Sequence, residues 1–328
     1  MVNRRVRMAF QVALILAMSL LGACAAPEEP DQVSIRLKWE HQGQFAGIYV
    51  ADQEGYYAEE NLDVTIEPLD MDRQVTTEYV LNGENDFALG APEEMIIARG
   101  EGKPVQAISV IYKIVPLVYM TPAETGIESP HDFPGNTVAL SPGQGTYLYE
   151  AIMGVLDIDR SQVNEIDMPS WDVVECWESA DVCPGYAISD IPYAEHEDIP
   201  VQAIWPGEYG VPFYGDVLFT TDTFVEENPD VVQRFVRATL KGWQKAIETP
   251  ELAADAVMAF ASDADRELEL ESVETSIPLI DTGDGQIGRM SEDVWIEMHD
   301  VLLDRGLIEE PVNVSTVYTN EFVENVQP

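Results

Sequence analysis

The fold of this chain is decided by residues 37–51, which read Leu-Lys-Trp-Glu-His-Gln-Gly-Gln-Phe-Ala-Gly-Ile-Tyr-Val-Ala. A short predicted strand, 33–37, ends inside this stretch, and an amphipathic helix with Ile48 and Tyr49 on one face starts at once. Residues 62–66 predict the next strand. Strand and helix go on alternating along the chain, which predicts an α/β fold.

Four residues just after the first strand are candidates for a ligand site. In an open α/β sheet, ligands bind beyond the carboxyl ends of the strands. An aromatic plane beside several hydrogen-bonding groups suits a small heterocyclic ligand, so we assign this site to Trp39, His41, Gln42 and Gln44. His41 serves equally well as a structural hydrogen-bond partner, and Tyr49 belongs equally well to the core.

Residues 37–51 resemble the opening of the periplasmic binding proteins of the thiamine-precursor, riboflavin and sulfonate importers. Those proteins share their fold with the eukaryotic thiamine-pyrimidine synthase. Residues 86–94 and 228–238 carry the same resemblance, which covers roughly 33–325. It implies a two-lobed periplasmic-binding-protein fold (type II), in which each lobe is a mostly parallel sheet flanked by helices. The synthase uses a cysteine-rich cluster that this chain lacks, so we expect no enzyme activity and no cofactor.

The length after the leader also favours two lobes, since about 300 residues exceed one compact core. We predict crossings between the lobes near 116–120 and 208–217. The first lobe would then hold residues 32–117 plus 216–328, and the second lobe residues 118–215.

Further candidates for the ligand site lie where other strands end or the chain crosses between lobes. Gly90 allows close backbone approach, and Glu94 either caps the helix that follows or accepts from an exocyclic amine. The helix that opens the second lobe offers the equivalent corner, without a Lys or Arg for phosphate. The remaining candidates are Ser141, Gly143, Thr146, Tyr186, Tyr209, Tyr214 and Asp216.

Residues 1–23 form a predicted signal peptide, with Arg4, Arg5 and Arg7 before an apolar run. The run ends in Leu-Gly-Ala-Cys, the pattern of a bacterial lipoprotein cleavage site, so we expect Cys24 to carry lipid. An ordinary signal peptide or an uncleaved anchor is the alternative. Residues 24–31 are too polar to pack and read as a tether. We therefore expect the protein on the outer face of the cytoplasmic membrane, serving an ABC permease and its ATPase as a monomer.

Charge excludes one class of partner. The leader holds three of the 17 basic residues and none of the 60 acidic ones, so the rest of the chain has a formal charge of −46. Nucleic acid, itself a polyanion, would be repelled. Strong acidity with only five Lys indicates adaptation to high salt, or simply solubility outside the cytoplasm.

Two cysteines remain once Cys24 is set aside, namely Cys176 and Cys183. A lone nearby pair in an exported protein predicts a disulfide. A metal site is the alternative, but no His is spaced with the pair, so we expect no metal.

We rank a thiamine pyrimidine precursor first as ligand, riboflavin second and an alkyl sulfonate last. A buried anion needs fixed donors, and neither Arg73 nor Arg99 falls at a strand end. Binding of sulfonate- or nitrate-type anions and a pyrimidine-synthase-like enzyme remain the alternative functions.

Overall fold

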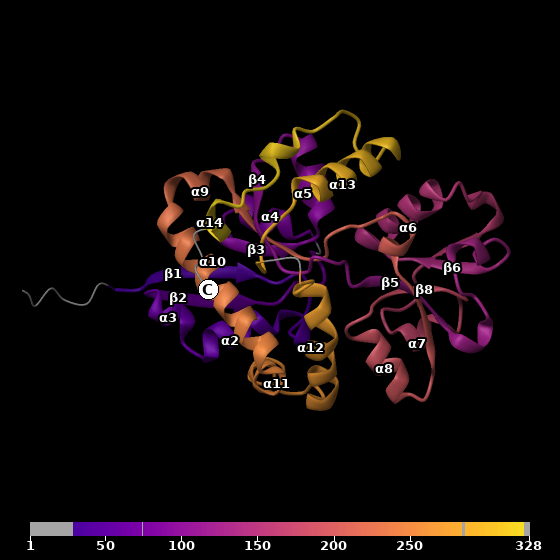
Figure 1. Ribbon diagram of the computed structural model, residues 1–328, viewed down its shortest axis with the longest axis horizontal. Coiled ribbons are helices and arrows are strands. Elements are labelled where there is room, and N and C mark those ends of the chain that lie inside the picture. Colours follow the sequence, from indigo (N-terminus) through magenta and orange to yellow (C-terminus); the bar gives the residue numbers. More distant parts are fainter. Residues whose placement is uncertain (1–28, 74, 284–285, 325–328) are drawn as a thin grey trace, which may run out of the picture.

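The computed structural model describes residues 29–73, 75–283 and 286–324. Its strands form two separate bodies, which lie at the left and the right of Figure 1. The first is a five-stranded sheet of order β2-β1-β3-β10-β4. The second combines a three-stranded sheet, β8-β5-β9, with the strand pair β6-β7. We call these bodies lobe 1 and lobe 2.

Lobe 1 has a mixed sheet. Four strands run in one direction, and β10 is inserted antiparallel between β3 and β4. The reversal follows from the route of the chain, because β10 is the strand by which it returns from lobe 2. The strands are β1 (Asp31–Arg36), β2 (Leu62–Glu67), β3 (Phe87–Gly90), β4 (Val105–Val110) and β10 (Val217–Thr221).

The deciding stretch forms the first strand–helix unit of this sheet. The alternation of β1 buries Val33 and Ile35, and the 3-10 helix η1 (Gly43–Phe45) leads into α2 (Ala46–Gln53). Gly55 takes a left-handed conformation, so the predicted single helix is divided into α2 and α3 (Tyr56–Glu59).

Helices cover both faces of the lobe 1 sheet. The long α10 (Pro229–Glu248) packs on α2 at two glycines, because a Cβ on Gly242 would lie 2.1 Å from the carbonyl oxygen of Gly47. The other helices of this lobe are α4 (Thr76–Leu81), α5 (Pro92–Gly100), α9 (Asp222–Glu227), α11 (Pro250–Met258), α12 (Arg266–Ile280), α13 (Glu292–Asp304) and α14 (Glu321–Glu324).

Lobe 2 is not the mostly parallel sheet that we expected. Its central strand β5 pairs antiparallel with both β8 and β9, and only β6 and β7, which α6 connects, run parallel. The strands are β5 (Leu117–Pro122), β6 (Thr137–Leu140), β7 (Asn164–Asp167), β8 (Cys183–Tyr186) and β9 (Val201–Ile204). The helices are α6 (Gln144–Val155), α7 (Val173–Cys176) and α8 (Asp190–His196).

The chain passes between the lobes after β4 and again before β10. The first segment, 111–116, and the second, 205–216, are held together by backbone hydrogen bonds, among them Val115 N to Phe213 O (3.1 Å) and Gly215 N to Tyr112 O (2.8 Å). Short 3-10 helices complete the chain, namely η2 (Ala123–Thr125), η3 (Pro130–Asp132), η4 (Arg160–Gln162), η5 (Pro206–Tyr209) and η6 (Val314–Thr316).

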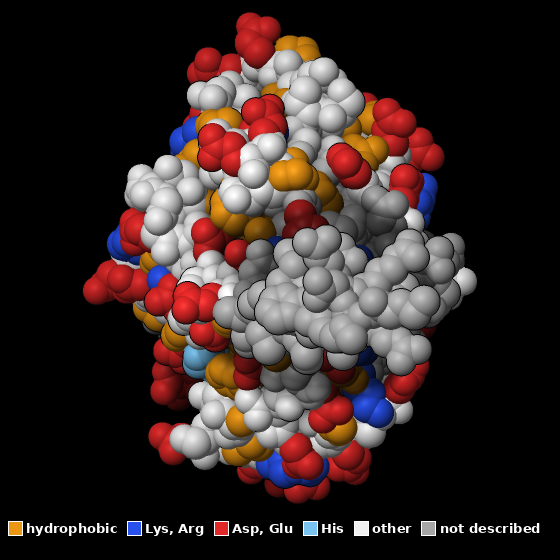
Figure 2. All heavy atoms as spheres, turned by 90° about the vertical axis from the view of Figure 1, so that its left-hand side faces the viewer, with side chains coloured by type: hydrophobic (Ala, Val, Ile, Leu, Met, Phe, Trp, Pro, Cys, Tyr) orange, Lys and Arg blue, Asp and Glu red, His pale blue; other side chains and the backbone are white. Residues whose placement is uncertain are grey.

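Acidic side chains are spread over the surface. Figure 2, which shows the face at the left of Figure 1, has Asp and Glu across most of the view and far fewer Lys and Arg. Within the described part of the chain, every helix is too short or too polar to cross a bilayer. The predicted leader and Cys24 lie outside the described residues.

Cys176 and Cys183 form a disulfide in lobe 2, with their Cα atoms 6.3 Å apart. Both side chains are fully buried in the core cluster that α7 and β8 share. The bond therefore connects the end of α7 to the start of β8.

We expect reduction of this disulfide to lower the free energy of unfolding by about 2–3 kcal/mol, because the unfolded chain would lose its short closed loop. Urea unfolding of the native protein with and without reductant measures the change, and Cys176→Ser/Cys183→Ser, which cannot form the bond, should match the reduced protein. An unfolding midpoint that reduction leaves unchanged would contradict the prediction.

Candidate functional site

A cavity of ≈ 790 Å³ lies between the two lobes. Lobe 1 lines it with residues that follow the carboxyl ends of its strands, including Lys38 after β1, Leu69 after β2 and Ala91 after β3. Lobe 2 contributes the turn before α6 and the end of β8, including Tyr186. The cavity thus occupies the position where open α/β sheets bind ligands.

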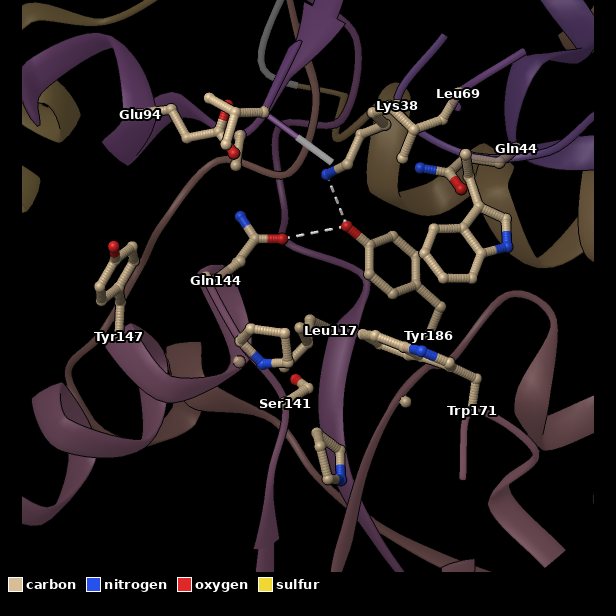
Figure 3. A pocket seen from close by; sticks show the side chains of 18 of the residues that line it. Lys38, Gln44, Leu69, Glu94, Leu117, Ser141, Gln144, Tyr147, Trp171 and Tyr186 are labelled. Carbon is tan, nitrogen blue, oxygen red and sulfur yellow. Dashed lines mark hydrogen bonds between the residues drawn. The ribbon is translucent and has the colours of Figure 1, made fainter. Parts of the chain in front are cut away.

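The segment after β1 stays hydrogen-bonded to the segment that follows β2. Leu37 N donates to Glu67 O (2.8 Å), and Leu69 N donates to Trp39 O (3.0 Å). These bonds hold the backbone on either side of Lys38 while its side chain enters the cavity (Figure 3).

Lys38 is a cation in the middle of this cavity, with 14% of its side chain exposed. Its Nζ donates to the Tyr186 hydroxyl (2.7 Å) and to Asp216 Oδ1 (3.0 Å). Burial lowers the pKa of Lys38, but Asp216 and Tyr186 raise the pKa by more, and the net value lies well above the ordinary one. Lys38 therefore stays charged at any physiological pH.

Asp216 lies behind Lys38 and is fully buried. Its second carboxylate oxygen accepts from Gln44 Nε2 (2.7 Å), and Gln44 Oε1 accepts from Gln42 Nε2 (2.7 Å). Because a carboxylate at this position only accepts, the orientation of both amides is fixed.

A second branch of the same network crosses between the lobes. The ammonium of Lys38 only donates, so the Tyr186 hydroxyl accepts from it and donates onward to Gln144 Oε1 (3.0 Å), as drawn in Figure 3. Gln144 Nε2 then donates to Glu93 Oε2 (3.2 Å). The path starts in lobe 1, runs through two side chains of lobe 2 and returns to lobe 1.

Three buried carboxyl groups in and beside the cavity have raised pKa values. Burial raises the pKa of Glu94 to about 7, and burial together with the neighbouring Glu94 raises that of Glu93 to about 7. Glu94 lines the cavity and accepts from Thr76 Oγ1 (3.4 Å). Glu93 Oε1 is buried and has no hydrogen-bond partner among the described residues. In lobe 2, burial raises the pKa of Asp190 to about 7.

Two tryptophans bring aromatic surface from opposite lobes. The rings of Trp39 and Trp171 meet edge to face, with centroids 5.2 Å apart. Both line the cavity, and Trp171 is 47% exposed, which places it at the mouth. An aromatic ligand that enters between the lobes would pass this pair.

The structure brings most of the predicted site residues together. The cavity is lined by Trp39, Gln42, Gln44, Glu94, Ser141, Gly143 and Tyr186. Asp216 contacts two of its polar residues without lining it.

Besides Asp216, six predicted site residues lie outside the cavity lining. Tyr49 is fully buried and its ring stacks on Phe260. Its hydroxyl shares a hydrogen bond with Nδ1 of His41 (3.0 Å). Both residues therefore face the α2 side of lobe 1. Tyr214 belongs to the core, and its hydroxyl accepts from Ser291 N (2.7 Å).

Local structure accounts for the other three. A Cβ on Gly90 would lie 2.9 Å from Phe219 and Thr76, so this glycine is required for packing. Thr146 Oγ1 donates to the carbonyl of Ser141 (2.7 Å). Tyr209 packs at the crossing, in η5.

Among the cavity residues that sequence reasoning missed, Lys38, Gln144 and Trp171 bear most on its chemistry. Lys38 directly follows the predicted first strand and is one of only five lysines, so it is a fixed donor for an anion that Arg73 and Arg99 are not. Arg36, also omitted, is engaged with Glu67 (3.0 Å) and not with the cavity.

Two known proteins are similar to this chain over almost its whole length. The chain is 25% identical to the formylaminopyrimidine-binding protein of Halalkalibacterium halodurans, over 94% of this chain and 97% of that protein. It is 24% identical to the riboflavin-binding protein RibY of Chloroflexus aurantiacus, over 94% and 96% of the two chains.

A solved structure confirms the fold class that the sequence predicts. The periplasmic aliphatic sulphonate binding protein SsuA from Escherichia coli superposes with a TM-score of 0.71 at 12% identity, covering 90% of this chain and 99% of that one. At this identity the likeness concerns the periplasmic-binding-protein fold alone. The profile of the NMT1/THI5-like family matches residues 42–253, and the chain belongs to this family.

Proposed function

We propose that this protein is the extracytoplasmic substrate-binding protein of an ABC importer and captures a small aromatic heterocycle between its lobes. A pyrimidine precursor of thiamine is the first candidate ligand, and riboflavin is the second. The protein hands the ligand to the permease and catalyses no reaction. Residues 1–23 direct export, and lipid on Cys24 holds the protein at the outer face of the cytoplasmic membrane.

The observation that carries this proposal is the composition of the cavity wall. Trp39 and Trp171 offer aromatic faces, while Gln42 and Glu94 offer amide and carboxyl groups at fixed positions. Ligand sites combine apolar and aromatic surface with a few convergent polar groups in this way. A flat ring with hydrogen-bonding edges fits both parts of the wall.

The charge of the wall disfavours an anionic ligand. Its cations are Lys38, already paired with Asp216, and Lys103, paired with Glu101 (2.7 Å). Its carboxyl groups belong to Glu78, Glu94, Glu101, Asp190 and Glu269. A sulfonate would bring a further negative charge into a region of excess carboxyl groups where Asp216 already compensates the charge of Lys38, which costs more than binding a neutral ring.

The names of two relatives support the same ligand class, since one is a formylaminopyrimidine-binding protein and another is a riboflavin-binding protein. A synthase-type enzyme is disfavoured by the cysteines of this chain. Two of the three, Cys176 and Cys183, are joined in lobe 2, and the third is in the predicted lipid-attachment motif. A cysteine-rich cluster therefore cannot form at the cavity.

We expect calorimetric titration to detect binding of 4-amino-5-hydroxymethyl-2-methylpyrimidine (hydroxymethylpyrimidine below) or of riboflavin, and much weaker binding of MOPS, an organic sulfonate. Trp39→Ala should lower the affinity for the heterocycle roughly tenfold or more, because the substitution removes stacking and apolar burial. Tyr56→Ala, an aromatic truncation on α3 outside the cavity lining, is the control and should leave the affinity intact. Binding of MOPS but of neither heterocycle would contradict the proposal.

We also expect the affinity for riboflavin to rise with pH near neutrality. Burial raises the pKa of Glu94 to about 7, so its carboxyl group becomes a carboxylate, the stronger acceptor for a ligand N–H, as the pH increases through that value. Below this pKa the affinity should fall by at most about tenfold per pH unit.

Titrations between about pH 6 and pH 8 measure this dependence, since riboflavin itself stays neutral there. Glu94→Gln should abolish the pH dependence of the affinity. Glu93→Gln is the matched control and should keep this dependence, because Glu93 faces Gln144 and does not line the cavity. A profile that Glu94→Gln leaves unchanged would remove Glu94 from the ligand site.

A further inference from the structure

Lys38 is a cation of the cavity that the predicted ligand set did not include, and its ammonium has a donor left for a ligand. A lysine ammonium carries three N–H groups. Two of those on Lys38 are used, by Tyr186 and by Asp216. In Figure 3 the Lys38 side chain enters the cavity from lobe 1 and ends between Glu94 and Tyr186.

Asp216 keeps this ammonium at its place. The carboxylate is fully buried, and Gln44 holds its other oxygen at 2.7 Å. The carbonyl of Asp216 accepts from Ile111 N (2.8 Å), so the residue is fixed to the first crossing segment. Withdrawal of Lys38 to solvent would leave a buried carboxylate without its counter-ion, which is strongly unfavourable.

Lys38 and Glu94 present opposite hydrogen-bonding characters on one wall. The ammonium only donates, whereas the Glu94 carboxylate only accepts. A planar heterocycle with an acceptor atom beside an N–H group satisfies both residues at once. A ligand that has only acceptors would place an acceptor against the Glu94 carboxylate, which is unfavourable. A ligand that has only donors would place a donor against the Lys38 ammonium, which is equally unfavourable.

We propose that Lys38 is a specificity-determining residue of this cavity and donates a hydrogen bond to an acceptor atom of the heterocycle, either a ring nitrogen or a carbonyl oxygen. Lys38 thereby selects rings that combine an acceptor with a donor over aromatic amines of the same shape that lack the acceptor. This inference rests on the proposed function, since it names the atom of the captured heterocycle that the protein reads.

The test is a set of titrations with hydroxymethylpyrimidine and with its benzene analogue, the amino-methylbenzyl alcohol in which carbon replaces both ring nitrogens. Wild-type protein should prefer the pyrimidine. Lys38→Met should weaken pyrimidine binding roughly 10- to 100-fold, the range for a hydrogen bond to a charged group, and leave the benzene analogue nearly unchanged. If the wild-type protein binds riboflavin instead, the same loss is expected for riboflavin.

Two further variants keep the result interpretable. Lys241→Met removes an exposed lysine on α10 that pairs with Glu59, so it makes the same change of net charge outside the cavity and should bind like wild type. Lys38→Met/Asp216→Asn removes both members of the buried pair, which avoids an uncompensated carboxylate if the single variant folds poorly. Circular dichroism checks that each variant is folded.

The outcomes separate the two claims. A loss of pyrimidine preference in the folded Lys38 variants supports the assignment. If the wild-type protein binds a heterocycle and the Lys38 variants bind it with the same affinity, the role of Lys38 is overturned and the proposed function stands. Wild-type protein that binds neither heterocycle overturns the proposed function, and the role of Lys38 with it.

Discussion

The buried ion pair between Lys38 and Asp216 is the interaction on which the geometry of the cavity depends. Neither charge is tolerable in a protein interior by itself, so each fixes the position of the other. Lys38 follows the first strand and Asp216 precedes the last one, so the pair connects the segment after β1 to the segment by which the chain returns from lobe 2. Through Tyr186 and Gln144 the same pair extends into lobe 2.

This arrangement also accounts for the electrostatic character of the site. The surface is strongly acidic, and the cavity wall has an excess of carboxyl groups as well. Lys38, whose charge Asp216 compensates, does not make such a wall an anion site. It makes a directional donor within a field that favours neutral or weakly basic rings. The carboxyl group of Glu94, with its raised pKa, adds an acceptor that becomes stronger as the pH rises through neutrality.

Much of the fold follows from local sequence patterns. Alternating apolar residues in 33–37 and the helical spacing after Phe45 predict β1 and α2, and the strand-end rule places Trp39, Gln42 and Gln44 at the cavity. The direction of β10 was not predictable locally, because it depends on the route of the chain through lobe 2. The same is true of the antiparallel strands around β5.

The site was harder to predict than the fold. Tyr49 and Tyr214 have the residue type of ligand contacts, but which way an aromatic side chain points is decided by packing, and both point into the core. Lys38 was missed because an isolated lysine usually lies on the surface, and only the distant Asp216 makes its burial possible. Partners that are 178 positions apart in the sequence cannot be matched from spacing alone.

A crystal structure of the protein with the heterocycle that binds most tightly tests the central claim most directly. The account predicts the ring between the lobes, with its face against Trp39 and a ring nitrogen or carbonyl oxygen within hydrogen-bond distance of Lys38 Nζ. A heterocycle bound outside the cavity between the lobes would contradict the account.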